Sequence, residues 1–371
     1  MNFESKKIKI LLVIEQASIS YKYFENILIE LQNYPQFNVE VFNLVKNDLI
    51  NNHLKQFCYK VSCLPTNKPY KQQLHNFKEI IRASEADIIH AHEVIPSFYA
   101  AMGLMLNFSA TKLIFHRHHS FYRDNVTRFM ERIAFFRCNL AISVSKATQK
   151  IAFSEHPFSK KKIIYLYNGI TVIDNKLPIP IDINNYKSEY KIVLLARLRS
   201  RKGHDTAIDA IDIVRKQLPN VKLFFAGEGD YRKVLESIIA EKKLQQHVIL
   251  LGDVQNIKPL LNEMDISILP SESEAFNLSI LETFACGKLS IASNLLSIKE
   301  CITDGLTGIL IEPGNSKQLA EKIIYYLTNK QKRDEIAANG YSLYNHQFTT
   351  VVMIKKMTDV YIRLNAGIKL F

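Results

Sequence analysis

The chain has 371 residues, of which 47% are hydrophobic and 23% are charged, a balance typical of soluble globular proteins with enough core for two domains. The 48 Lys and Arg residues exceed the 36 Asp and Glu residues, giving a formal net charge of +12, which favours anionic partners such as nucleotide diphosphates, anionic lipid, polysaccharide or nucleic acid. The sequence has no apolar run long enough to cross a bilayer, and its first residues indicate a strand rather than a signal peptide. Its five scattered cysteines argue against a disulfide framework or a zinc site and favour a reducing, cytoplasmic environment.

The first half of the chain alternates short apolar runs with segments of helical periodicity. Strands are expected at 8–14, 39–44, 87–89, 112–115, 140–144 and 162–166, and helices at 21–31, 72–83, 97–106 and 126–137. This alternation predicts right-handed crossovers and a parallel, doubly wound sheet, so residues 1–172 are expected to form a Rossmann-like domain.

A segment rich in Pro, Asn and charge at 173–190 is the expected linker, and the pattern restarts after it. Strands are expected at 192–196, 222–226, 248–251, 266–269, 289–292 and 308–311, and helices at 205–217, 231–242, 257–263, 278–285, 317–327 and 351–370. Residues 191–349 therefore predict a second Rossmann-like domain. The predicted fold class is α/β, with two doubly wound parallel sheets that face a cleft and bind ligands at the carboxyl ends of their strands.

One stretch of the second half combines a helix start with paired carboxylates. After the expected strand at 266–269, a polar loop carries Glu274 and leads into an apolar-periodic helix. Asn277 suits the N-cap position, so the first amides of the helix, from Leu278 on, can bind a phosphate. Glu282 shares a helix face with Leu278 and can accept hydrogen bonds from ligand hydroxyls. A nucleotide sugar fits these features, but so does an ordinary strand, loop and helix with solvated glutamates.

The spacing of the two glutamates also carries a family resemblance. Glu274, seven residues and then Glu282, followed by small residues at 285–287, resembles the E-x7-E motif of retaining GT-B glycosyltransferases, in particular family 4. In that family the first Glu holds hydroxyls of the transferred sugar and the second binds the ribose. The family's Gly-Phe-Gly after the first Glu is Ala-Phe-Asn here, so the resemblance implies that Phe276 and Asn277 belong to the donor site.

A basic run follows the first strand of the second domain. Four cations lie within the six residues 197–202, where they can clamp a phosphate, although a solvated basic loop is the alternative. The run resembles the family's G-R-x(n)-K-G element, which implies that Arg197 and Lys202 hold the donor diphosphate. Gly227 lies in a Gly-Glu-Gly turn similar to one that approaches the nucleotide in the family, although a simple tight turn is the more ordinary interpretation. Val254 lies in a region similar to the one whose backbone reads the base.

Histidines mark an expected strand end of the first domain, in the run His-Arg-His-His-Ser at 116–120. Three imidazoles can bind a metal, but adjacent residues at a strand end point in different directions and no carboxylate pattern accompanies them, so we expect no metal. The family places a His here against the transferred sugar, near its reactive carbon. The resemblance implies this role for His118, with His116 as the alternative. If His118 has this role, we expect His116 on the acceptor side.

Two further elements resemble acceptor-side parts of the family. His90 and His92 lie at a neighbouring strand end and are expected to be structural or acceptor-side. Gln16 belongs to a glycine-free loop at 15–20, where the family has a Gly-rich loop that approaches acceptor and phosphate.

The segment 121–137 reads as a basic amphipathic helix. Such a helix can lie on an anionic membrane, but the simpler prediction is that its apolar face packs on the sheet. Peripheral contact with the inner face of the cytoplasmic membrane stays open, through the exposed arginines and Lys160 to Lys162. The apolar face comprises Val126, Phe129, Met130, Ile133 and Phe136.

The resemblance implies an acceptor-side first domain, a nucleotide-sugar-binding second domain and a C-terminal helix, residues 350–371, that crosses back to the first domain. We expect a retaining hexosyltransferase that moves a sugar from a nucleotide diphosphate sugar, with UDP-sugar favoured, to a cell-surface glycan or glycolipid in lipopolysaccharide or other polysaccharide biosynthesis. Arg197, Lys202 and the helix N-terminus at Leu278 would stabilise the departing diphosphate in place of a metal. His118, Glu274, Arg197 and Lys202 are thus the expected catalytic residues, without cofactor or nucleic acid.

Two alternatives stay open. The same fold can serve a sugar-nucleotide epimerase or a phosphorylase. Use of free phosphate as the acceptor would reveal a phosphorylase, and isomerisation of the donor without transfer would reveal an epimerase. The positive charge is also compatible with a nucleic-acid-binding protein. However, the sequence has no aromatic-basic recognition motif, and nucleic-acid binding leaves the paired glutamates unexplained.

Overall fold

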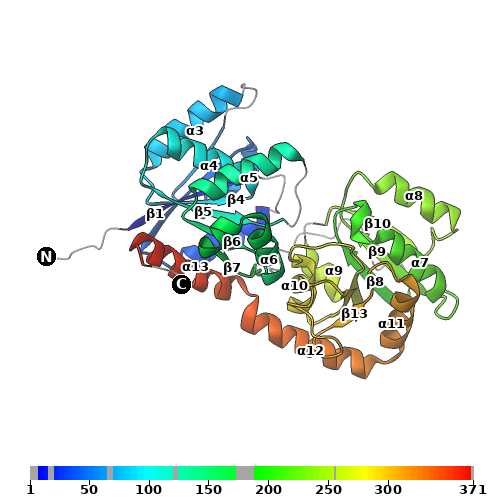
Figure 1. Ribbon diagram of the computed structural model, residues 1–371. Coiled ribbons are helices and arrows are strands. Elements are labelled where there is room, and N and C mark those ends of the chain that lie inside the picture. Colours follow the sequence, from blue (N-terminus) through cyan, green and yellow to red (C-terminus); the bar gives the residue numbers. More distant parts are fainter. Residues whose placement is uncertain are drawn as a thin grey trace. The chain divides into compact units, whose positions relative to one another are not determined.

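A computed structural model of the chain describes residues 7–15, 21–64, 70–119, 124–172, 188–254 and 256–368 (Figure 1). The chain divides into two compact units. Unit 1 comprises Met1–Gly169 and Thr350–Phe371, and unit 2 comprises Ile170–Thr349. The C-terminal segment therefore belongs to the first unit. The expected linker at 173–190 lies outside the described residues as far as residue 187.

Unit 1 is built on seven parallel strands in the order β3-β2-β1-β4-β5-β6-β7. The strands are β1 (Ile8–Ile14), β2 (Phe37–Asn43), β3 (Lys60–Cys63), β4 (Ile88–His92), β5 (Lys112–Arg117), β6 (Leu140–Ser143) and β7 (Ile163–Tyr165). The inner strands are continuous apolar runs because both faces of a parallel sheet are covered. The strand order reverses between β1 and β4, and the carboxyl ends of these strands are the usual ligand position in such a sheet.

The helices of unit 1 cover both faces of this sheet. They are α1 (Tyr21–Leu31), α2 (Asp48–Leu54), α3 (Tyr70–Ser84), α4 (Val94–Leu106), α5 (Asn125–Arg137), α6 (Lys146–Glu155) and α13 (Thr350–Asn365), with a 3-10 turn, η1 (Pro157–Lys162). Leu11 and Val13 of β1 share a core with Phe77 of α3 and Leu104 of α4. On the opposite face, Tyr361 of α13 contacts β4.

The structure corrects the prediction for α5. Met130 and Ile133 pack against the core of the sheet as expected, but Val126, Phe129 and Phe136 are 62%, 61% and 79% exposed. Glu131 is buried instead and lies 2.9 Å from Arg117 of β5. The helix therefore faces the sheet with this buried ion pair as well as with part of the expected apolar face.

Unit 2 has a six-stranded parallel sheet in the order β10-β9-β8-β11-β12-β13. Its strands are β8 (Tyr190–Leu195), β9 (Val221–Ala226), β10 (Val248–Gly252), β11 (Ile266–Leu269), β12 (Leu289–Ser293) and β13 (Ile309–Ile311). Its helices are η3 (Ser200–Lys202), α7 (His204–Val214), α8 (Arg232–Glu241), α9 (Ile257–Asn262), α10 (Leu278–Ala285), α11 (Ser316–Thr328) and α12 (Lys330–Gln347).

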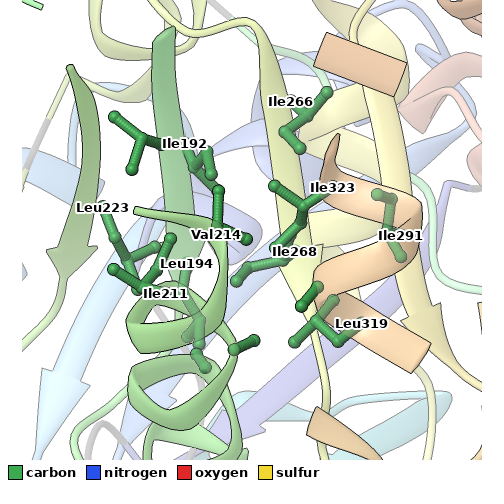
Figure 2. Packing of buried hydrophobic residues seen from close by; sticks show 14 of the residues in the cluster. Ile192, Leu194, Ile211, Val214, Leu223, Ile266, Ile268, Ile291, Leu319 and Ile323 are labelled. Atoms are coloured by element: carbon green, nitrogen blue, oxygen red, sulfur yellow. The ribbon is translucent and has the colours of Figure 1, made fainter. Parts of the chain in front are cut away.

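Figure 2 shows the core of unit 2, where alternate residues of β8 and β11 meet α7 and α11. Ile192 and Ile268 lie among the side chains of Val214 and Ile323, and all four are fully buried. This core holds β8 and β11 in place, and the strand order reverses between them. The predicted fold class, two doubly wound parallel sheets, is confirmed.

Candidate active site

Two loops of unit 2 lie together at the point where its strand order reverses, one after β8 and one after β11. The Glu272 N–H donates to the Arg201 carbonyl at 3.1 Å. Gly203 closes the first loop with φ 75°, and a Cβ at this position would lie 2.0 Å from the carbonyl oxygen of Pro270. Only glycine tolerates both the backbone angle and the contact, so Gly203 fixes how closely the loops approach.

Lys202 and Glu274 form an ion pair between these loops. The Lys202 ammonium donates to both carboxylate oxygens of Glu274, at 2.8 and 2.9 Å. Their side chains are only 27% and 6% exposed. Ser297 holds the Glu274 backbone by donating to its carbonyl at 2.7 Å. A ligand that takes up either charged group must replace this pair.

A pocket of about 670 Å³ opens at the carboxyl ends of β8, β9 and β10. Guanidinium groups of Arg197 and Arg199 line it together with carboxylates, among them Glu282 of α10. Guanidinium groups bind phosphate oxygens and carboxylates accept hydrogen bonds from hydroxyls. The lining therefore suits a ligand that carries both phosphate and sugar hydroxyls. The remaining lining includes Gly227, Glu228, Gly229, Asp230, Asp253 and Val254.

The Gly-Glu-Gly turn packs directly against the loop after β8. A Cβ on Gly227 would lie 2.1 Å from the Ala196 carbonyl oxygen, and one on Gly229 would lie 2.1 Å from that of Leu198. The Leu198 N–H donates to the Glu228 carbonyl at 3.1 Å. The two glycines thus permit backbone packing between neighbouring loops, as in the tight-turn interpretation, while the turn also lines the pocket.

The N-terminus of α10 is partly occupied by its own cap. The Asn277 side chain accepts from the amides of Ser279 and Ile280, at 2.8 and 3.3 Å, and from the Ser279 hydroxyl at 2.5 Å. The N-cap prediction for Asn277 is confirmed. Because Asn277 engages these two amides, an anion at this helix end would meet the Leu278 amide first.

In unit 1, four histidines share one face of the sheet at the ends of β4 and β5. His90 and His92 are two residues apart, as are His116 and His118, so each pair points to the same side. The His90 Nε2 lies 3.2 Å from the His116 Nδ1, and the His92 Nδ1 lies 3.0 Å from the His118 Nε2. Stacking joins the two layers, with ring centroids 4.3 Å apart for His90 and His92 and 4.2 Å apart for His116 and His118.

Burial keeps this histidine stack uncharged at neutral pH. Desolvation lowers the pKa of His90 to about 3 and that of His118 to about 4. It also lowers the pKa values of His92 and His116 well below the usual range, and neighbouring imidazoles lower them further. The hydroxyl of Tyr361 lies 2.7 Å from the His90 Nδ1. The stack therefore presents neutral hydrogen-bonding groups rather than positive charge.

The opposite face of the same strand end holds a charged network, contrary to the expectation that no carboxylates accompany the histidines. Arg117 lies 2.6 Å from Glu155, in addition to its pair with Glu131. The His119 Nδ1 lies 2.7 Å from a carboxylate oxygen of Glu93. Although burial opposes protonation, the carboxylates of Glu131 and Glu93 raise the pKa of His119 to about 9.

The backbone of Glu93 has an unusual conformation, with φ 75° and ψ 172°. Residues other than glycine rarely adopt this region, which costs on the order of 1–3 kcal/mol. The Glu93 N–H donates to the His116 carbonyl at 2.8 Å, and its carboxylate holds His119. These bonds keep a strained residue directly after His92.

Two groups of side chains have potential metal-ligand atoms within 4.8 Å of one another: His90, His92 and His116, and Glu131, Glu155 and His156. In the first group ring nitrogens already contact other imidazoles, His90 Nε2 with His116 Nδ1 and His92 Nδ1 with His118 Nε2. In the second group the carboxylates already balance Arg117. The prediction that the protein uses no metal stays a prediction.

Family models match most of the chain. Residues 177–343 match the model described as glycosyl transferases group 1, and residues 50–172 match the model described as glycosyltransferase family 4. The chain belongs to glycosyltransferase family 4. The resemblance carried by the sequence motifs is thereby confirmed at the level of the family.

Similar proteins agree with this membership. The glycosyltransferase is 26% identical over 353 residues to an uncharacterized glycosyltransferase of Methanocaldococcus jannaschii, covering 89% of this chain and 93% of that protein. It is 22% identical to the N-acetyl-alpha-D-glucosaminyl L-malate synthase of Bacillus anthracis, over 76% of each. Among solved structures, HepE of Anabaena in complex with UDP and glucose has a TM-score of 0.83 at 20% identity, over 95% of this chain and 99% of that one. These likenesses place the glycosyltransferase in the GT-B fold.

The structure places the predicted donor-site residues of the glycosyltransferase in the loops of unit 2. Arg197, Gly227, Val254 and Glu282 line one pocket, while Lys202 and Glu274 are bonded to each other. Phe276 is buried against Phe348, with ring centroids 5.9 Å apart, so it supports the loop from behind. Gln16 lies outside the described residues.

Sequence reasoning missed several residues that the structure brings to these sites. Arg199, Asp230 and Asp253 line the pocket, and each lies in or beside a stretch already singled out. Arg117 and Glu131 were missed because nothing local marks a charged residue as buried. Lys202 and Glu274 were both predicted as site residues. Their direct hydrogen bond was not, because the two residues are 72 positions apart and no local pattern indicates the contact.

Proposed function

We propose that the protein is a retaining, metal-independent glycosyltransferase that transfers a hexose from a nucleotide diphosphate sugar, with UDP-sugar favoured, to a cell-surface glycan or glycolipid. The observation that carries the proposal is the pair of loops after β8 and β11, which places Arg197 and Glu282 in one pocket and joins Lys202 to Glu274. Structures of HepE hold UDP and UDP-glucose, which supports the choice of base.

The donor site would work through charge. Arg197 binds the diphosphate, and Lys202 exchanges Glu274 for a phosphate oxygen when the donor arrives. Glu274, released from Lys202, accepts hydrogen bonds from hydroxyls of the transferred sugar, and Glu282 accepts those of the ribose. As the bond between sugar and diphosphate breaks, negative charge grows on the diphosphate. Arg197, Lys202 and the Leu278 amide stabilise this charge.

Retention would follow from attack on the same face that the diphosphate leaves, with a leaving phosphate oxygen taking the acceptor proton. Glu274 then orients the sugar and forms no covalent bond to it. In unit 1, the neutral His118 contributes a hydrogen bond to the transferred sugar, while His92 and His116 hold its ring in place through the stack. A neutral imidazole suits this position because a glycosyl transition state carries positive charge.

Products of a synthetic acceptor series would test the transfer. We expect UDP to bind with calorimetrically measurable heat and without added metal, and Arg197→Ala to weaken that binding. Glu274→Ala is expected to reduce transfer at least about 100-fold while UDP still binds, because the Glu274 carboxylate binds the sugar rather than the diphosphate. Near-normal turnover in both variants would overturn the proposal, and an inverted anomer in the NMR spectrum of the product would exclude retention.

A specific observation also supports membrane contact. Val126, Phe129 and Phe136 of α5 are exposed, Arg128 and Arg132 of the same helix are exposed too, and its one acid, Glu131, is buried. Exposed aromatic side chains beside arginines suit the interface of an anionic bilayer, as a glycolipid acceptor at the inner membrane face would require. No described helix is long and apolar enough to span a bilayer.

This contact has its own test. Phe129→Ser combined with Phe136→Ser should weaken binding to anionic vesicles about tenfold or more. The variant lacks two aromatic rings that would otherwise be buried in the bilayer interface. UDP binding in unit 2 is expected to stay unchanged. Equal vesicle binding by this variant and the unchanged protein would remove α5 from the contact.

A further inference from the structure

A groove of about 1000 Å³ lies in unit 1 between the edge strand β7 and the C-terminal helix α13. Its floor is apolar and includes Phe153 of α6, Ile164 of β7 and Val360 of α13. Its rim is basic. Lys160 and Lys161 of η1 line one side, and Lys355 and Lys356 of α13 line the other.

The charges on the rim are unbalanced. All four lysines are exposed, and among the described residues none has an ion-pair partner. The one acid of the lining, Asp359, lies 2.9 Å from Arg363 and is thereby neutralised. An apolar floor between two rows of unpaired lysines is complementary to a molecule with an apolar chain and a negative head group.

The turn η1, which carries two of these lysines, is bonded to the end of α5. Lys162, next to Lys161, donates to the carbonyl oxygens of Phe135 and Cys138 at the C-terminal end of α5. Phe158 of η1 is fully exposed, and it lies two residues from Lys160. The rim of the groove thus adjoins a surface that carries exposed aromatic and basic side chains and suits a bilayer.

We propose that this groove binds a single anionic lipid, with the acyl chain on the apolar floor and the phosphate between Lys160, Lys161, Lys355 and Lys356. The lipid comes from the bilayer on which α5 rests, so the proposal deepens the membrane contact of the proposed function. The bound lipid tethers unit 1 to the surface and leaves the donor pocket of unit 2 unaffected.

Vesicle binding tests the charge of the rim. The variant with all four lysines changed to alanine should lose about 100-fold or more of its affinity for phosphatidylglycerol vesicles, since each lysine near an anionic surface contributes roughly a fivefold factor. The control, with Lys216, Lys233, Lys317 and Lys330 of unit 2 changed to alanine, removes the same amount of exposed charge elsewhere and should bind as the unchanged protein does. Unchanged binding by the groove variant would overturn the proposal. So would an equal loss in the control, because it would show that overall charge alone governs binding.

A series of alkyl phosphates, from ethyl to decyl and below their micelle concentrations, tests the floor. Affinity measured by calorimetry should rise about three- to fourfold with each added methylene until the groove is filled. In the same experiment, inorganic phosphate measures the affinity of the groove for the head group alone. If it binds as tightly as decyl phosphate, the groove is only an anion site and the lipid assignment is wrong.

Two further results separate this proposal from its neighbours. UDP binding by the four-lysine variant should equal that of the unchanged protein, so a failure of the donor-site proposal would show in both proteins and would leave the groove result intact. Polyglutamate serves as the probe for an acidic protein partner. If it displaced decyl phosphate and bound more tightly than vesicles, the groove would serve such a partner instead of a lipid.

Discussion

The two sheets of this glycosyltransferase follow the same topological rule but place opposite chemistry at their strand ends. In unit 2 the reversal between β8 and β11 gathers Arg197, Lys202 and two glutamates, which are charged and partly accessible. In unit 1 the ends of β4 and β5 gather stacked imidazoles, which burial keeps neutral. Under the proposed function this difference is useful, because cations stabilise a departing diphosphate and uncharged imidazoles do not repel a positively charged sugar ring. The sheet topology supplies only the place, and local burial decides the charge.

The largest effect that would break this comparison is expected at Gly203. Gly203→Ala should destabilise unit 2 by about 4 kcal/mol, because the left-handed backbone and the overlap with the Pro270 carbonyl both oppose a side chain. Differential scanning calorimetry should show a lower transition for unit 2. Gly314→Ala is the matched control, since Gly314 has the same φ of 75° but open space around it. It should cost only about 1 kcal/mol, and equal losses in the two variants would show that the overlap has no effect.

A slightly smaller effect is expected from Lys202→Ala. Transfer should fall about 100-fold, since the diphosphate loses one cation and Glu274 keeps a buried charge without its partner. Steady-state kinetics with saturating donor would measure the loss. Lys242→Ala removes a half-buried lysine that pairs with Asp209 at 3.1 Å, and it should leave turnover unchanged. An unaffected rate for Lys202→Ala would exclude this lysine from the donor site.

The pH dependence of stability should separate the two units further. A buried histidine with a lowered pKa binds its proton more weakly in the folded state, so stability falls as pH decreases below the usual value of 6.5. For each such histidine of unit 1 the loss is about 1.4 kcal/mol per pH unit down to its folded pKa. Among its described residues, unit 2 has one comparable histidine, His204, whose pKa burial lowers to about 4.

Calorimetric scans from pH 7 to about pH 5 should therefore move the unit 1 transition downward more than the unit 2 transition. His90→Asn and His118→Asn together should flatten the unit 1 curve, because asparagine does not titrate. Parallel shifts of both transitions would contradict the assignment of four neutral histidines to unit 1.

The smallest effect is expected at the cap of α10. Asn277→Ala should cost about 1 kcal/mol, because the amides of Ser279 and Ile280 lose their acceptor. Asn277→Gly should cost only a few tenths of a kcal/mol and restores the residue that the family usually has. Chemical denaturation would measure both. A cost for Gly equal to that for Ala would mean that the side-chain bonds do not stabilise the helix start.

Much of the fold could be predicted from the sequence because buried parallel strands are apolar runs. The strand Ile266–Leu269 and the helix Leu278–Ala285 have the bounds expected from their residues. The elements that were missed lack this pattern. Strand β3 is a short edge strand whose residues are exposed or half-exposed, and the buried face of α12 has few large apolar residues because it includes Arg333, Ala337 and Gly340. The start of α6 is marked by Ser145 and Thr148, a capping box without the usual Glu or Gln.

Site residues could be predicted where a short stretch of sequence contains the motif, but not where residues distant in the sequence come into contact. Arg197 could be found from the basic run after β8, and Glu282 from its spacing to Glu274. The burial of Glu131 could not, since it depends on Arg117 of another element. The whole apolar stripe of α5 was therefore expected on the sheet, although only Met130 and Ile133 pack there and Val126, Phe129 and Phe136 are exposed.

The ion pair between Lys202 and Glu274 has a consequence for the speed of the catalytic cycle. Under the proposed function, the nucleotide diphosphate product must be held by the same lysine that donates to Glu274 in this structure. Glu274 is then an internal competitor of the product, and it regains Lys202 as soon as the transferred sugar no longer occupies it. Tight binding of the intact donor and rapid departure of the spent nucleotide can thus coexist in one site, because the sugar itself keeps the competitor engaged.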